Sequence, residues 1–293
     1  MRLVLRAAAV TVLTAVGVVA CLYARIVSPG GRLGLAATAW WSRALLRVLG
    51  IPVVREQADD VGPGPYVVVS NHTSMLDICI AAAAVPVPFF FTSRPAYFRV
   101  PLLGWGMHLA RHVPLDPTRP RQAAAALARL GERFERGFSV LLFPEGTRSF
   151  DGTLLRYRRG PFLTAIRHGI PVLPVYMEGV HERLRRGTLR LSPGEVRLTI
   201  GSPLPTAGLE ESASRDLAQR VETWSREQQA RHRPDTAEPD TADSAAAEPG
   251  PAEPATPEPA APEPPTPEPA APERAATEPA AARTPLPRAG RAG

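Results

Sequence analysis

Five short apolar runs alternate with longer helix-like stretches through the middle of the chain, and this alternation restricts the fold more than any other feature. Each run has the length of a buried strand; the runs are Tyr66–Val69, Pro88–Phe91, Val113–Leu115, Ser139–Phe143 and Pro171–Val175. Strands that alternate with helices form a largely parallel sheet flanked by helices. We therefore predict an α/β fold, in which ligands bind at the carboxyl ends of the strands.

Three further elements are predicted around these strands. Arg121–Arg136 is rich in Ala, Leu and Glu, which predicts a helix. Thr188–Leu191 and Val196–Ile200 flank a Ser-Pro-Gly-Glu turn and predict a hairpin that closes the sheet. Leu209–Gln229 predicts a polar surface helix at the end of a domain that we place at residues 53–230.

Residues 1–30 predict an N-terminal membrane-anchoring helical segment. An uncharged run that includes the 17 residues Ala7–Tyr23, followed by Ala24 and then Arg25, is a little shorter than the ~20 residues that cross a bilayer perpendicularly. The run fits either a short span or a deeply seated helix. Val18–Cys21 also resembles a lipoprotein cleavage box, so export is the rival interpretation.

Residues 31–52 hold a second helix, in which apolar residues recur at roughly helical spacing from Leu33 to Leu49. Its adjacent Trp40 and Trp41, with arginines interspersed, fit the headgroup region of a membrane and favour an interfacial helix. The same spacing fits an ordinary helix that faces the core. The sequence leaves both interpretations open.

Residues 231–293 cannot build a core. They hold 16 of the 34 prolines and 11 of the 28 acidic residues, with an acidic residue every five positions from Glu238 to Glu278. They contain no aromatic residue, so burial cannot offset the entropy that ordering costs. We predict that these residues form a disordered Pro/Ala/Glu-rich C-terminal tail. Without the tail, the rest of the chain is basic.

Several classes of function lack support in the sequence. There is no GxxxxGK[ST] loop for a nucleoside triphosphate, no GxGxxG fingerprint for a dinucleotide and no Gly-x-Ser-x-Gly nucleophile elbow. The two cysteines, Cys21 and Cys79, exclude a disulfide framework, and no Cys/His cluster has the spacing of a zinc site.

Two polar clusters follow predicted strands directly, at Ser70–Asp77 and Pro144–Ser149. In the first, four residues separate His72 from Asp77 at a strand-to-helix junction, where a turn can bring the carboxylate to one imidazole nitrogen. Such a pair makes a general base, because the carboxylate fixes the tautomer and leaves the other nitrogen to accept a proton. The alternative is a loop histidine with Asp77 as a helix cap.

The second cluster has the chemistry of a phosphate site. Gly146 permits a tight turn with exposed amides, Thr147 and Ser149 supply hydroxyls, and Arg148 supplies a guanidinium group that binds phosphate through two hydrogen bonds. A plain structural turn is the alternative for such a loop taken alone.

Together the two clusters resemble the glycerophospholipid acyltransferase family, in particular its 1-acyl-glycerol-3-phosphate (lysophosphatidate) acyltransferases. His72 and Asp77 match the family's His-x4-Asp block, and Phe143–Ser149 matches its Phe-Pro-Glu-Gly-Thr-Arg-Ser block without a change. Two weaker matches, to an aromatic-basic-x-Gly step and an apolar block with two prolines, are Tyr157–Gly160 and Ile170–Val175. The resemblance covers about residues 53–203.

One block departs from the family pattern. Where the family has Gly-x-x-Phe-x-x-Arg, this chain has Pro117 at the position of the arginine. Arg119 or Arg111 is expected to supply the missing guanidinium group, and we assign Arg119 to acceptor binding.

The resemblance implies transfer of a fatty acyl group from acyl-CoA or acyl-carrier protein to the 2-hydroxyl of 1-acyl-glycerol-3-phosphate, which forms phosphatidate in phospholipid biosynthesis. His72 is then the catalytic base and Asp77 its orienting carboxylate. The implied substrate-binding residues are Glu145, Gly146, Thr147, Arg148 and Arg119. Glu145 either binds acceptor hydroxyls or anchors its loop.

No metal or cofactor is implied, since a thioester is already activated and the acyl donor acts as a co-substrate. The expected partners are membrane lipids, a lysophospholipid acceptor and the acyl donor, without nucleic acid. We expect the cell membrane as the location, with the catalytic domain facing the cytoplasm, where acyl donors are found. The alternatives are an acyltransferase of this family for another lyso-lipid or glycolipid, and a non-catalytic, membrane-tethered lipid-binding adaptor.

Overall fold

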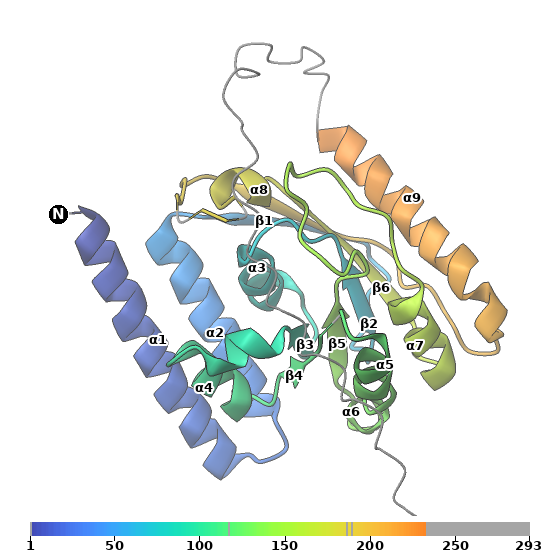
Figure 1. The fold of residues 1–293 in the computed structure, drawn as a ribbon, viewed down its shortest axis with the longest axis horizontal. Coiled ribbons are helices and arrows are strands. Elements are labelled where there is room, and N and C mark those ends of the chain that lie inside the picture. The colour runs from blue at the N-terminus through green and yellow to red at the C-terminus, as the bar shows by residue number, and fades with distance from the viewer. Residues whose placement is uncertain (1, 117, 186, 189, 233–293) are drawn as a thin grey trace, which may run out of the picture. The chain divides into compact units, whose positions relative to one another are not determined.

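The computed structural model describes residues 2–116, 118–185, 187–188 and 190–232. In this part of the chain a seven-stranded sheet has the order β1-β7-β6-β2-β5-β3-β4 (Figure 1). The strands are β1 (Val53–Gln57), β2 (Val67–Ser70), β3 (Phe89–Ser93), β4 (Val113–Pro114), β5 (Ser139–Leu142), β6 (Val172–Glu178) and β7 (Val196–Ile200). Neighbouring strands are parallel except β6 and β7, which confirms the predicted α/β fold with a largely parallel sheet.

Helices lie against both faces of this sheet. The helices of the described residues are α1 (Arg2–Val27), which packs on α2 and α4, α2 (Arg32–Leu49), α3 (Leu76–Ala84), α4 (Leu103–Leu109), α5 (Pro120–Ala128), α6 (Gly131–Glu135), α7 (Gly160–His168), α8 (Val180–Arg183) and α9 (Ser214–His232), with 3₁₀ turns η1 (Pro95–Arg99) and η2 (Glu211–Ala213). α2 and α3 pack on each other over one face, while α7 and α9 pack over the other (Figure 1).

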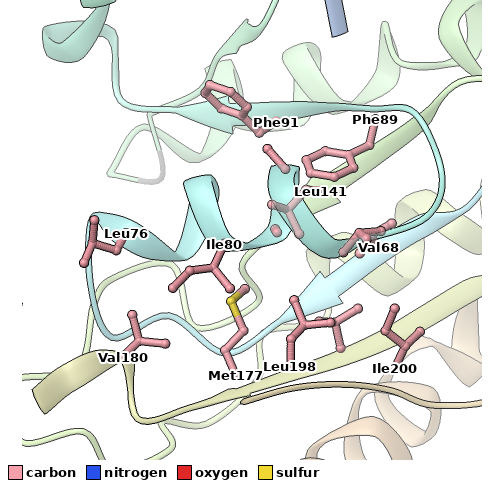
Figure 2. Close-up of a cluster of buried hydrophobic side chains, with 14 of the residues drawn as sticks. Val68, Leu76, Ile80, Phe89, Phe91, Leu141, Met177, Val180, Leu198 and Ile200 are labelled. Carbon is pink, nitrogen blue, oxygen red and sulfur yellow. The ribbon is translucent and has the colours of Figure 1, made fainter. Parts of the chain in front are cut away.

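The alternation of side chains along β2 divides the core into two layers. Val68 points to the layer that contains Leu76 and Ile80 of α3, and Figure 2 shows these side chains together. Val67 and Val69 point to the opposite layer, which α7 and α9 cover. All three valines are almost completely buried, as expected for a central strand of a parallel sheet.

The predicted hairpin at the end of the domain is wrong. β7 pairs antiparallel with β6 and parallel with β1, whereas the described residues of Thr188–Leu191 lie outside the sheet, with a single bridge from Leu191 to Leu184. β1 was not predicted because it is an edge strand: four of its five side chains are exposed, so its sequence, Val53–Gln57, has no apolar run.

The predicted helix Arg121–Arg136 is divided into α5 and α6. The break places Gly131 against the imidazole ring of His168 in α7, where a Cβ atom would lie 3.0 Å from Cε1. A larger residue there would require the His168 ring to shift by a few tenths of an ångström, and glycine also weakens a continuous helix. The polar helix predicted to begin at Leu209 begins instead at Ser214, after η2, and extends to His232.

The N-terminal helix α1 is long and apolar enough, by length and composition, to cross a membrane. Most of its side chains are exposed, and the buried ones, Gly17, Cys21 and Ala24, recur once per turn. α1 packs against α2 and α4, and a Cβ atom at Gly17 would lie 2.8 Å from Cδ1 of Trp41. Cys21 is therefore buried within a continuous helix.

The second helix faces the core with one side, and its placement at a membrane interface stays a prediction. Leu45 and Leu46 of α2 are buried, whereas Trp40 is exposed. The helix ends at Leu49 and is capped by Gly50, which has a left-handed conformation with φ of 73°. The predicted disordered tail lies outside the described residues, apart from Arg231 and His232 at the end of α9. The predicted domain limits at residues 53 and 230 stay predictions.

Candidate active site

The two predicted polar clusters lie beside each other at one edge of the sheet. β2 ends at Ser70 and β5 ends at Leu142, and the two strands are parallel neighbours with Val69 opposite Leu142. The chain therefore leaves both strands at their carboxyl ends, where parallel α/β sheets bind their ligands.

In the first cluster, His72 and Asp77 form a direct hydrogen bond. His72 Nδ1 and Asp77 Oδ2 are 2.7 Å apart, and Oδ2 also accepts the backbone N–H groups of Thr73 at 2.7 Å and Ser74 at 2.9 Å. Because Oδ2 accepts two amide protons, we assign the imidazole hydrogen to Nδ1. Nε2 then carries a lone pair, as a general base requires.

The two side chains of this pair differ in burial. The Asp77 side chain is 1% exposed and lies in the first turn of α3, while the His72 side chain is 17% exposed. The carboxylate is thus enclosed, and part of the imidazole ring remains accessible to a substrate. The adjacent Asn71 fixes the loop to β6, because its side-chain amide exchanges two hydrogen bonds with the backbone of Met177, at 2.8 and 2.9 Å.

Phe143 and the second cluster, which follows it, make three contacts with His72. Glu145 Oε1 accepts the backbone N–H of His72 at 2.9 Å, and the Ser149 N–H donates to the His72 carbonyl oxygen at 2.9 Å. The Phe143 ring stacks on the imidazole ring, with centroids 3.9 Å apart and planes 13° from parallel. The loop after β5 therefore fixes both the backbone and the ring plane of His72.

Glu145 is buried beneath this loop, with 3% of its surface exposed. Burial raises the pKa of its carboxyl group from 4.5 to about 8, although hydrogen bonds from the His72 and Leu155 amides act in the opposite direction. At neutral pH this enclosed carboxyl group is protonated, and its hydrogen bond with the His72 backbone holds the two loops together. Of the two roles that the sequence allowed, this placement favours anchoring over contact with acceptor hydroxyls.

The remaining predicted residues of the loop lie around its turn. Gly146 has a φ of 72°, and its N–H donates to the Phe143 carbonyl oxygen at 3.2 Å. Thr147 and Arg148 follow and are half-buried. Arg148 Nη2 donates to the hydroxyl oxygen of Tyr97 at 3.2 Å, so a contact from η1, beyond β3, positions this guanidinium group.

Arg119 lies in a different environment. It immediately precedes α5, its side chain is 66% exposed, and its Nε lies 3.7 Å from Asp116 Oδ2. Among the described residues, no hydrogen bond or ion pair joins it to the loops that hold His72 and Gly146. The assignment of Arg119 to acceptor binding stays a prediction.

Two contact residues were missed from the sequence. Phe143 was predicted as the end of a strand and as the first residue of the Phe-Pro-Glu-Gly-Thr-Arg-Ser block, but not as a contact of His72, and nothing was predicted for Tyr97. The stacking of Phe143 on His72 and the hydrogen bond from Arg148 to Tyr97 join residues that are 71 and 51 positions apart. The spacing of residues in a single sequence does not predict contacts between segments this far apart.

Comparison with known proteins gives a consistent family. Residues 52–178 match the family model described as Acyltransferase. The chloroplastic 1-acyl-sn-glycerol-3-phosphate acyltransferase BAT2 of Brassica napus is 38% identical over 141 residues, which are 48% of this chain and 41% of that protein. The 1-acyl-sn-glycerol-3-phosphate acyltransferase of Pseudomonas aeruginosa is 28% identical over 196 residues, which are 67% of this chain and 74% of that protein.

The chain spans about two fifths of the length of the first of these curated relatives. A solved structure shares the fold: the 1-acyl-sn-glycerophosphate (LPA) acyltransferase PlsC of Thermotoga maritima is 24% identical, with a TM-score of 0.59. The match covers 80% of this chain and 100% of that one. The resemblance first seen in two sequence blocks is thereby confirmed at the level of the family and of the fold.

Proposed function

We propose, from the premise that residues 52–178 belong to the glycerophospholipid acyltransferase family, that this chain acylates the 2-hydroxyl of 1-acyl-glycerol-3-phosphate. The observation that carries the proposal is the 2.7 Å hydrogen bond between His72 Nδ1 and Asp77 Oδ2, beside a glycine-containing loop with a guanidinium group. A base and an anion-binding loop at one sheet edge are the two parts that this reaction needs.

In the proposed reaction, His72 Nε2 removes the proton of the acceptor hydroxyl while its oxygen attacks the thioester carbonyl carbon. The tetrahedral intermediate collapses, the C–O ester bond is complete and the C–S bond breaks. The imidazolium proton passes to the leaving thiolate, which restores neutral His72. Asp77 holds Nδ1–H throughout and stabilises the transient positive charge. The stacked Phe143 ring adds a favourable cation–π contact in that state.

Phosphate binding is assigned to the turn of the second loop. The turn at Gly146 and Thr147 and the Arg148 guanidinium group would bind the phosphate and so place the neighbouring 2-hydroxyl at Nε2. The acyl donor is acyl-CoA or acyl-carrier protein. Because the thioester is already activated, positioning and an oriented base suffice for the reaction, without a cofactor or metal.

Membrane association is part of the proposal. The exposed apolar side chains of α1, together with the basic domain, suit a bilayer that contains anionic lipids and lysophospholipid. We place the protein at the cell membrane with its catalytic domain facing the cytoplasm, since acyl-CoA and acyl-carrier protein are cytosolic. Membrane lipids, and not nucleic acid, are then the partners of the basic surface.

The test is an assay of the purified full chain in detergent with both donor types. The acceptor panel contains lysophosphatidate, lysophospholipids with larger headgroups, a glycolipid and monoacylglycerol. We expect acylation of lysophosphatidate with the highest kcat/KM, and loss of activity in His72→Ala. A preference for another acceptor would assign the chain to another reaction of the same family. Absence of acyl transfer to every acceptor would favour a lipid-binding adaptor.

A further inference from the structure

A second guanidinium group, that of Arg158, lies directly over the turn at Gly146. A Cβ atom at Gly146 would lie 3.0 Å from Cζ, 3.1 Å from Nε and 3.2 Å from Nη1 of Arg158. Three nearly equal distances mean that the guanidinium plane faces the turn. Glycine is favoured here by its φ of 72°, and its lack of a Cβ atom permits this close approach of the Arg158 side chain.

The backbone on both sides of this side chain is fixed. The Arg158 N–H donates to the carbonyl oxygen of Pro144 at 2.9 Å. The preceding Tyr157 is buried, its N–H donates to Glu222 Oε2 at 2.9 Å, and its hydroxyl donates to Ser225 Oγ at 3.0 Å. α9 thus holds Tyr157 in place, and Tyr157 in turn places Arg158 at the loop.

The N–H groups of the Arg158 guanidinium remain available. Its side chain is exposed, and within the described residues no hydrogen bond or ion pair engages it. A guanidinium group carries its donors around the edge of its plane, so a group lying flat over Gly146 directs them sideways, beside the turn. An anion at the loop amides would meet these donors.

We propose that Arg158 binds the phosphate of the acceptor together with Arg148, and that it supplies the guanidinium group missing from the block that contains Pro117. This inference rests on the proposed function. A phosphate monoester carries about −1.5 to −2 charges at neutral pH and can accept hydrogen bonds from two guanidinium groups. Arg158 would then select phosphorylated over neutral acceptors.

The neighbouring Arg159 provides a matched control. It has the same charge and is also exposed, but it immediately precedes α7, where its carbonyl oxygen accepts the Leu163 N–H at 2.9 Å. The pKa of Glu211 in η2 is lowered mainly by hydrogen bonds from Arg167 and to a smaller extent by the charge of Arg159. Arg159 therefore lies near η2. Because Arg158 and Arg159 carry the same charge, a comparison of their variants separates the effect of position from the effect of charge.

The experiment compares Arg158→Gln, Arg158→Lys and Arg159→Gln in steady-state kinetics with lysophosphatidate and with monoacylglycerol. We expect Arg158→Gln to raise the KM for lysophosphatidate about 10- to 100-fold, as for loss of a charge-assisted hydrogen bond, with kcat changed less than about threefold. Arg158→Lys should recover part of this loss, and Arg159→Gln should stay within about twofold of wild type. The rate with monoacylglycerol should not change in any variant.

An unchanged KM for lysophosphatidate in Arg158→Gln would overturn the inference while leaving the proposed function intact. Equal slowing with both acceptors would also overturn it, because Arg158 would then only support the loop. A wild-type chain inactive with lysophosphatidate would instead overturn the proposed function. Thermal unfolding of each variant in detergent shows whether its fold is retained, and Arg158→Lys provides the second test if Arg158→Gln does not fold.

Discussion

The loop that carries His72 and the segment that carries Arg119 both follow the carboxyl ends of strands, but they are held in different ways. His72 is fixed by Glu145 and Ser149, more than 70 residues along the chain. The contacts of Asp116 are local: its carboxylate accepts the Thr118 N–H at 3.0 Å and hydroxyl at 2.6 Å, and lies 3.7 Å from Arg119. Long-range contacts restrict which side chains are tolerated, whereas local contacts at an exposed segment restrict little. The block around Arg119, which departs from the family pattern in sequence, belongs to the segment with local contacts.

The largest expected effect is that of His72→Ala. Removal of the base should lower kcat by about 10²–10⁴-fold, with fold and membrane association retained, because the accessible part of the ring does not belong to the core. Acyl transfer to lysophosphatidate and thermal unfolding in detergent provide the measurements. A variant that kept more than about a tenth of the wild-type rate would exclude His72 as the base.

Asp77→Asn should be the next most severe change. An asparagine amide that donates to Nδ1 places the imidazole hydrogen on Nε2, so the base is lost in most molecules. We expect kcat/KM to fall about 10- to 1,000-fold, with lowered stability because the carboxylate oxygen also accepts two backbone N–H groups. Asp116→Asn removes a carboxylate from the exposed segment and is the matched control, with an expected change below about twofold. Equal effects of the two substitutions would contradict the comparison.

Much of the fold and the outline of the site can be predicted from the sequence because they depend on local patterns. Apolar runs predict five strands of the sheet, and the rule that ligands bind at strand carboxyl ends places His72 and Arg148 at one edge of it. The His72–Asp77 contact is predictable for the same reason, since both residues belong to one strand-to-helix turn.

The supporting contacts could not be predicted because they depend on packing between distant segments. Whether Glu145 faces a substrate or the His72 backbone is decided by how the β5 loop packs on the β2 loop. The same holds for Arg158, whose approach to Gly146 depends on the packing of Tyr157 against α9. β1 was missed for a different reason, since an exposed edge strand carries no hydrophobic pattern.

Glu145→Gln tests the buried support of the His72 loop through the pH dependence of stability. The folded protein holds a proton on Glu145 up to about pH 8, whereas the unfolded chain releases it near pH 4.5. With respect to this group, the free energy of unfolding is therefore highest below pH 4.5 and falls as the pH rises toward 8. The glutamine variant keeps the acceptor oxygen but lacks this titration. Urea unfolding in detergent from pH 5 to 8 should show a steeper loss of unfolding free energy in wild type, and equal slopes would contradict the assignment.

The smallest effect is expected for Arg119→Gln, and it tests the other side of the comparison. The Arg119 side chain is 66% exposed, and its pairing with Asp116 at 3.7 Å is of the kind that contributes about 0–1 kcal/mol. Because solvent screens this charge and only local contacts position it, we expect the KM for lysophosphatidate to rise by no more than about twofold. Parallel kinetics with Arg158→Gln provide the measurement. A rise of tenfold or more in Arg119→Gln, with Arg158→Gln unchanged, would show that the exposed segment reorganises around the acceptor and supplies the second guanidinium group itself.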